Sequence, residues 1–188
     1  MRLLGWSLFV LALPAMALAG GFKNVDHKHW TDKYDHHFRK HSKHYFGPAV
    51  DWRWFKAQGI AESGLDPDAK SKVGAVGIMQ IMPATFEDIR KKNPSLASLE
   101  EPKWNIAAGI YYDRYLFDKW DFLSVDTQQR LFFSFASYNA GFRRIRKAYN
   151  KNVEKLKSIN SWEQVAASAP GATRYYVKRI HKLMQEIL

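Results

Sequence analysis

The residue best suited to acid–base chemistry in this 188-residue sequence is Glu62, within the stretch AESGLDPDAKSKVGAVGIMQIMPAT at residues 61–85. A free Glu side chain has a pKa of about 4.3, and a general acid working near neutral pH needs a pKa of about 6. That rise corresponds to about 2.3 kcal/mol, which burial against apolar and aromatic side chains can supply. On composition alone, an ordinary surface Glu at a helix end is the alternative interpretation.

The helix that must position Glu62 is predicted from the spacing of apolar residues before it. They recur at i, i+4, i+7 and i+11, which indicates one face of an α-helix, and Gly64 ends the pattern. Glu62 lies in the last turn, beside the apolar stripe rather than on it, so we expect its side chain along the edge of the core. The stripe consists of Val50, Trp54, Ala57 and Ala61.

Further helices are predicted from proline, glycine and capping signals. Pro83 begins a short helix to about residue 92, and Pro102 begins another to about 119. Asp126 and Gln129 form a capping box for a helix through 137, and Asn139-Ala140-Gly141 is expected to break it. A basic helix to about 149 follows. The last helix has its apolar stripe at Tyr176, Ile180, Leu183 and Ile187. Without a convincing strand or internal repeat, the sequence predicts an all-α domain.

Composition indicates one folded domain behind an export signal. The chain is 46% hydrophobic and 15% aromatic, which excludes general disorder. Residues 1–19 combine Arg2, an apolar stretch and an Ala-Leu-Ala cleavage site, as in a signal peptide. A membrane anchor is the alternative, but the apolar stretch is short for a span and contains Pro14. The chain has no Cys, so a lipid anchor on Cys is excluded, and we expect an exported, periplasmic protein.

Residues 20–46 hold six of the seven His residues, and we predict a loosely ordered, flexible arm there. In a helix, His37, His41 and His44 would share one face and could bind zinc or copper. The alternative, which we favour, is an arm whose imidazoles charge as the pH falls through about 6.5. We expect neither a metal nor another cofactor.

Basic residues indicate an anionic partner. After removal of residues 1–19, 28 Lys and Arg residues face 18 Asp and Glu residues, a formal charge of +10. The basic run at residues 143–147 would suit an anionic wall or membrane surface, or it is simply a solvated helix face. Nucleic acid is an unfavoured partner, because no nucleic-acid-binding motif accompanies the charge and the leader indicates export.

Three short motifs occur in a definite order: ESG at residues 62–64, GIMQIMPAT at 77–85 and SYNAG at 137–141. Together they resemble the signature of the soluble lytic transglycosylase (SLT) family over about residues 45–187. Each motif alone is weak evidence, whereas three at compatible spacing are strong evidence. The resemblance implies a lysozyme-like helical domain with a catalytic groove, which we place at residues 47–188.

The resemblance also implies a reaction. Most glycosidases use two carboxyl groups, whereas members of this family cleave the MurNAc–GlcNAc bond of peptidoglycan with a single Glu and without consuming water. In this sequence Glu62 matches that Glu, first as acid and then as base. The C6 hydroxyl of MurNAc attacks in place of a second carboxylate and closes a 1,6-anhydro ring. The resemblance further implies that the neighbouring N-acetyl group stabilises the positive charge between the two steps.

The same resemblance implies roles around Glu62. Ser63 would orient the acetamido side of the sugar, and Tyr138 would set its hydroxyl near Glu62. Asn139 would fix the turn and touch the ligand, or else only cap a helix. The remaining substrate contacts would come from Met79, for which a core role is at least as good an interpretation, and from Gln80 and Met82, which would line the groove.

One departure and two alternatives stay open. The family often has Glu-Thr-Arg before the last helix, whereas this chain has Ala172-Thr173-Arg174, which puts a groove contact in doubt. A goose-type lysozyme has the same fold and Glu but hydrolyses the bond with the help of an Asp. Asp66 and Asp68 are near Glu62, yet the DPDA sequence favours a turn. The second alternative is a non-catalytic wall-binding protein.

Overall fold

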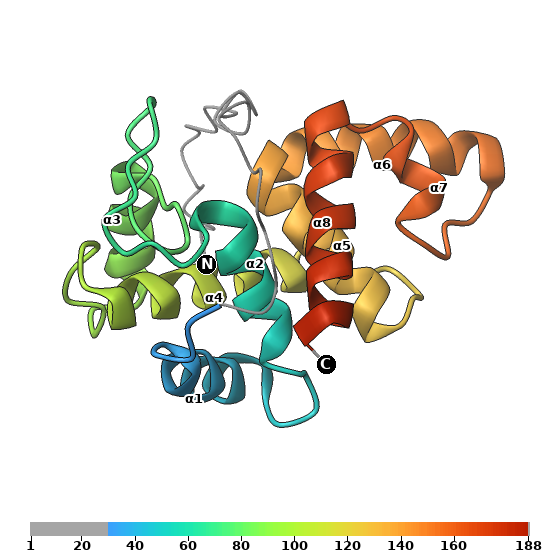
Figure 1. Ribbon diagram of the computed structural model, residues 1–188. Helices are drawn as coiled ribbons and strands as arrows, with labels where there is room; N and C mark the ends of the chain where they lie inside the picture. The colour runs from blue at the N-terminus through green and yellow to red at the C-terminus, as the bar shows by residue number, and fades with distance from the viewer. Residues whose placement is uncertain (1–29, 188) are drawn as a thin grey trace.

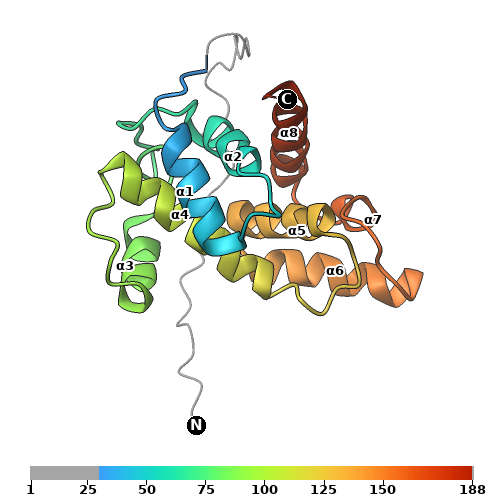
Figure 2. The same ribbon diagram turned by 90° about the horizontal axis from the view of Figure 1, so that it is seen from below.

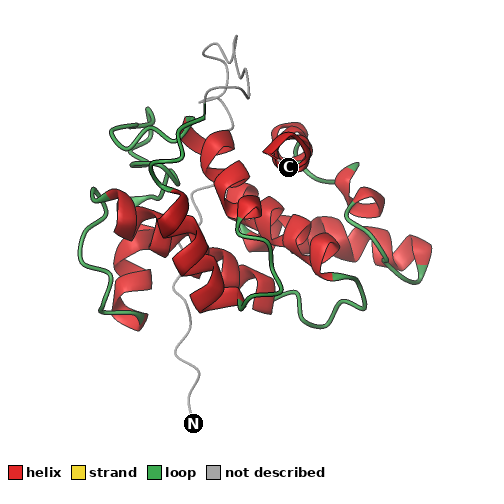
Figure 3. Cartoon of the chain, turned by 60° about the horizontal axis from the view of Figure 1, so that its bottom comes forward, coloured by secondary structure: helices red, strands yellow, loops and turns green. Residues whose placement is uncertain are grey.

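The computed structural model describes residues 30–187, which form eight helices and, within that range, no strand (Figures 1 and 3). Two isolated bridges join Lys70 to Val76 and Val76 to Ile81 inside a loop. The prediction of an all-α domain is confirmed. The helices are α1 Asp35–Phe46, α2 Arg53–Ser63, α3 Pro83–Lys92, α4 Pro102–Asp118, α5 Thr127–Ala140, α6 Phe142–Leu156, α7 Glu163–Ala166 and α8 Gly171–Ile187.

Helix α2 lies at the centre of the molecule, with α8 beside it and α1 below it in the view of Figure 1. Every residue of α2 from Trp54 to Ala61 is buried, so the helix is covered on all sides rather than along one stripe. Gly64 ends α2 in the left-handed conformation, with φ 70°, and its N–H donates to the Ile60 carbonyl. Glu62 therefore lies in the last turn, as predicted.

Helices α4 and α5 pack against each other, with α1 and α3 against α4 and with α6 and α8 against α5 (Figure 2). The Asp126 side chain accepts a hydrogen bond of 2.7 Å from the Gln129 N–H, which confirms the predicted start of α5. The predicted end of α5 is wrong by three residues. The helix continues through Asn139 and ends only at Gly141, whose φ of 85° suits glycine.

The prediction of a flexible arm over residues 20–46 is wrong for residues 35–46. They form α1, which packs against α4 and α2. Phe38 is fully buried and packs against Gly59 of α2. A Cβ at residue 59 would crowd the Phe38 ring, so the glycine allows α1 and α2 to approach closely. Lys56 of α2 is 6% exposed and forms an ion pair of 2.5 Å with Asp35. A buried ammonium group requires such a partner, and the pair joins α1 to α2.

Residues 1–29 and 188 lie outside the described part of the chain, and the signal peptide stays a prediction. Of the helices between residues 30 and 187, none has the length and apolar character needed to cross a membrane.

Helix α8 closes the structure against α2 and α5 (Figure 2). Its predicted stripe is confirmed at Tyr176, Ile180 and Leu183, which are at most 3% exposed. Because α8 comes last in the chain and α2 comes early, their contact brings residues more than 100 positions apart into one site.

Candidate active site

Glu62 lies where the end of α2 meets α8. Its carboxylate oxygen Oε1 accepts a hydrogen bond of 2.5 Å from the Tyr176 hydroxyl. Although the residue as a whole is only partly buried, its carboxyl group is desolvated, and this burial raises the pKa of Glu62 to about 7. The Tyr176 hydrogen bond and the positive charge of Arg179 oppose the rise. A carboxyl group with this pKa can both donate and accept a proton near neutral pH.

A second carboxyl group, on Asp113 of α4, lies within electrostatic reach of Glu62. Asp113 is fully buried, and its Oδ1 accepts a hydrogen bond of 3.3 Å from the Gln58 amide, one helical turn before Glu62. Its Oδ2 has no hydrogen-bond partner. Burial raises the pKa of Asp113 well above its ordinary range, and the charge of Glu62 adds to the rise. Both carboxyl groups thus have raised pKa values, and each is affected by burial first.

The turn at residues 77–80 is held against α4 by Asn105, which is fully buried. The Asn105 side-chain oxygen accepts from the Met79 N–H at 2.8 Å, and its amide nitrogen donates to the Val76 and Leu99 carbonyls at 2.9 and 3.0 Å. Gly77 has φ 75°, and a Cβ there would lie 2.6 Å from the Asn105 amide nitrogen. Only glycine satisfies both conditions, so Asn105 and Gly77 together determine the shape of the turn.

Met79 lies in the core, and a contact of its side chain with substrate stays a prediction. The side chain is fully buried, and a Cβ on Gly109 of α4 would lie 2.8 Å from it. The pairing of a methionine with a glycine lets the turn approach α4 closely. This was the core interpretation left open by the sequence.

Two further predicted contacts, Ser63 and Gln80, hold the loop at residues 64–81 in place. The Ser63 hydroxyl donates to the Ile78 carbonyl at 2.9 Å and accepts from the Asp66 N–H at 3.1 Å. The Gln80 side-chain nitrogen donates to the Gly77 carbonyl at 2.9 Å, and the residue has a left-handed φ of 46°. The same nitrogen also donates to the Ala69 carbonyl at 3.2 Å, so a saccharide hydroxyl would donate to the side-chain oxygen of Gln80. Substrate contacts by both residues stay predictions.

Tyr138 also bonds to the turn, because its hydroxyl donates to the Met79 carbonyl at 2.8 Å. The hydroxyl that contacts Glu62 is that of Tyr176 instead. Burial raises the pKa of Tyr138, and the charge of Glu62 is the second cause of that rise. Tyr138 is therefore close enough to Glu62 to be affected by its charge. Asn139 accepts a hydrogen bond of 2.8 Å from the buried Thr173 hydroxyl and so joins α5 to α8. Met82 lies partly exposed just before α3, and its substrate contact stays a prediction.

Three of the residues that shape the site were not predicted as site residues. Tyr176 was assigned to the core stripe of α8, and nothing in its spacing indicates that its hydroxyl reaches α2. Asp113 and Asn105 could have been noticed, because each is a polar residue on the face of α4 that is otherwise apolar and buried. Such residues are buried only when their polar atoms have a specific use.

His37, His41 and His44 of α1, the residues considered for metal binding, do not form a metal site with other side chains of the described residues. Between residues 30 and 187, no group of three or more His, Cys, Asp or Glu side chains is arranged to hold a metal ion. The site as built offers one carboxyl group for proton transfer, with a phenol bonded to it and a cation nearby.

Comparison with known proteins identifies the domain. The family model for the transglycosylase SLT domain matches residues 42–161. The membrane-bound lytic murein transglycosylase F of Aeromonas salmonicida is 25% identical over 174 residues, which cover 83% of this chain and 33% of that protein. The soluble lytic murein transglycosylase of Escherichia coli is 31% identical over 139 residues, or 71% of this chain and 20% of that protein.

A solved structure agrees with these sequence relatives. The 70-kDa soluble lytic transglycosylase from Escherichia coli superposes with a TM-score of 0.67 at 26% identity, over 84% of this chain and 24% of that one. The chain thus spans a third or less of the length of the relatives it matches. With the family model covering well over half of its residues, the chain belongs to the transglycosylase SLT domain family.

Proposed function

We propose that this protein is a lytic transglycosylase that cleaves the MurNAc–GlcNAc bond of peptidoglycan and leaves 1,6-anhydroMurNAc ends. The observation that supports it most is the desolvated Glu62 carboxyl group, whose pKa lies near 7 and which bonds to the Tyr176 hydroxyl. Relatives named as lytic murein transglycosylases support the substrate class.

In the proposed reaction Glu62 acts twice. Protonated Glu62 donates its proton to the glycosidic oxygen as the bond from C1 of MurNAc to that oxygen breaks. The C6 hydroxyl then attacks C1, and its proton passes to the Glu62 carboxylate as the new bond forms. The two steps return Glu62 to its protonated state without water. A pKa near 7 suits both roles, because each requires a different protonation state of one group.

The Tyr176 hydroxyl stabilises the Glu62 carboxylate between the two steps. When Glu62 has given up its proton, its carboxylate is charged in a desolvated place. A hydrogen bond from a phenol to a charged carboxylate stabilises it by about 1.5–3 kcal/mol, and Arg179 acts in the same direction. These groups keep the pKa of Glu62 from rising so high that proton donation fails.

Hydrolysis is the second candidate, and the observation that favours it is the second carboxyl group on Asp113. Hydrolysis of the goose-lysozyme type needs an Asp that contacts the attacking water. Asp113 is 0% exposed, and burial raises the pKa of its carboxyl group, so it is poorly suited to contact an attacking water. The Asp66 carboxylate accepts from the Asp68 N–H in a local turn, as the DPDA sequence predicts. Transglycosylation is therefore preferred.

Mass spectrometry of purified peptidoglycan digested with the protein tests this proposal. We expect muropeptides that end in 1,6-anhydroMurNAc, absent with Glu62→Gln and unchanged with Glu154→Gln, a matched substitution at an exposed position of α6. Products heavier by one water would establish hydrolysis. No cleavage by the wild-type protein would favour the non-catalytic wall-binding interpretation.

A further inference from the structure

A pocket of about 590 Å³ lies between α1, the loop that follows α3 and the start of α4. Its residues include Lys40, His41 and Tyr45 from α1, and Leu96 and Trp104 from the opposite side. None of the residues around Glu62 lines it. Its volume is within the range of small-molecule binding sites, and it is separate from the candidate active site.

The pocket has positive charge without a matching acid. No residue lining it from the described part of the chain is acidic. His41 shows the effect of this field: burial, followed by the charges of Lys40, His37 and His44, lowers the pKa of His41 to about 4. His41 is therefore uncharged at neutral pH and keeps one ring N–H as a hydrogen-bond donor. An anion in the pocket would be attracted by Lys40 and could accept from both side chains.

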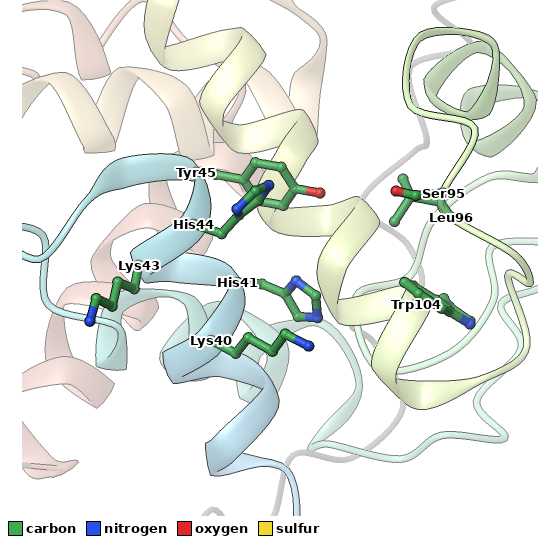
Figure 4. A pocket seen from close by; sticks show the side chains of 8 residues that line it. All are labelled: Lys40, His41, Lys43, His44, Tyr45, Ser95, Leu96 and Trp104. Atoms are coloured by element: carbon green, nitrogen blue, oxygen red, sulfur yellow. The ribbon is translucent and has the colours of Figure 1, made fainter.

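Figure 4 shows which side chains face the space. Lys40 and His41 extend from α1 toward Trp104 and Leu96, whereas Lys43 points away. Trp104 is partly buried and Leu96 is 1% exposed, so the far wall is apolar. The Tyr45 hydroxyl already accepts a hydrogen bond of 2.9 Å from Asn93. The Lys40 and His41 donors thus face the Trp104 ring across the space, with Ser95 and His44 also among the lining residues.

This arrangement fits a carboxylate with a short aliphatic body. A carboxylate can take one charge-assisted hydrogen bond from an ammonium group and one from a neutral imidazole. The aliphatic part would lie against the indole face. Phosphate recognition usually includes an Arg fork or a group of backbone N–H donors, and the described residues of this pocket include no Arg.

We propose that this pocket binds a carboxylate of a short peptide, with Lys40 and His41 as polar contacts and Trp104 as the apolar wall. The choice of peptide rests on the proposed function, since the peptide stems of murein carry carboxylates beside the glycan that Glu62 would cleave. The pocket would then hold a stem while the glycan occupies the site at the end of α2.

Calorimetric titration of the full chain with the tetrapeptide L-Ala-γ-D-Glu-L-Lys-D-Ala tests the proposal. We expect a Kd of about 1 mM or tighter and loss of binding when the carboxylates of the peptide are amidated. Lys40→Gln should weaken binding at least about tenfold, as expected for loss of one charge-assisted hydrogen bond. Lys43→Gln is the matched control: it removes the same charge from the same helix and should weaken binding less than about threefold.

Three results would overturn the proposal. They are no binding at about 10 mM peptide, equal weakening by the two lysine substitutions, and tighter binding of inorganic phosphate than of the peptide. The tetrapeptide contains no glycosidic bond, so its binding does not depend on cleavage. A protein that cleaves murein but ignores the peptide would refute this inference alone, and one that binds the peptide without cleaving murein would refute the proposed function alone.

Discussion

Replacing Glu62 with Gln should stabilise the protein, and by an amount that depends on pH. Burial raises the pKa of Glu62 from an ordinary value of 4.5 to about 7. When folding raises the pKa of a group, the contribution of that group to stability is fully present only below its pKa in the unfolded chain. As the pH rises from 4.5 to 7, the unfolded chain releases this proton before the folded protein does. The wild-type protein therefore loses stability over this window, whereas the Gln variant has no proton to lose there.

The size of the difference follows from the two pKa values. At 1.36 kcal/mol per pKa unit, the Gln variant should be more stable by about 0.2 kcal/mol at pH 4, about 1.4 at pH 5.5 and about 3 at pH 7 to 8. The Tyr176 hydroxyl can still donate to the amide oxygen of Gln, so the substitution keeps the hydrogen bond that the folded site requires.

Urea unfolding of both proteins at pH 4, 5.5, 7 and 8 measures this difference. Taking the difference cancels the titration of groups that the two proteins share. Glu154→Gln, at an exposed position, should change the free energy of unfolding by less than about 0.5 kcal/mol at every pH. A Gln variant no more stable than the wild type at pH 8, or a difference independent of pH, would refute the claim that the folded protein holds this carboxyl group desolvated.

Three further predictions concern the surroundings of the site. Tyr176→Phe removes a charge-assisted hydrogen bond of about 1.5–3 kcal/mol, so the alkaline limb of the kcat/KM profile should move up by about one to two pH units; an unmoved limb would contradict this. Asp113→Asn keeps a neutral polar group and should change the free energy of unfolding at pH 6 by less than about 1 kcal/mol, whereas Asp113→Ala should cost about 2–4 kcal/mol in urea unfolding. Gly77→Ala places a Cβ 2.6 Å from the Asn105 amide nitrogen and should cost about 2–4 kcal/mol. Gly74→Ala, also at positive φ but in open space, should cost about 1 kcal/mol, and equal losses would exclude the steric contribution.

The helix boundaries were largely predictable because local residues determine them. Pro83 and Pro102 begin α3 and α4 as predicted, and the Asp126 cap begins α5. Such signals depend on backbone geometry within one turn, so they can be identified without knowing the fold. Helix α1 was missed because its sequence is mostly polar, and its place in the core depends on Phe38 and on an ion pair to α2.

The site was predictable only where a motif contains the residue. Glu62 and the turn at residues 77–80 were found in this way, but their partners come from helices distant in sequence. Asn105 and Asp113 lie 26 and 55 positions from the residues with which they bond. Hydrogen bonds over such separations depend on how α4 packs, which no local pattern determines. For the same reason the sequence did not indicate that the Tyr138 hydroxyl, although close to Glu62, bonds to the turn.

The hydrogen bond from Tyr176 to Glu62 joins residues 114 positions apart. A ribosome that has just completed α2 has made a Glu with the acidity of the free amino acid, and it has the whole of α3 to α7 still to synthesise. The desolvated carboxyl group is formed only when the last helix docks. Its chemistry is thus a product of the finished chain, and a partly made or partly unfolded molecule would lack an acid of this strength.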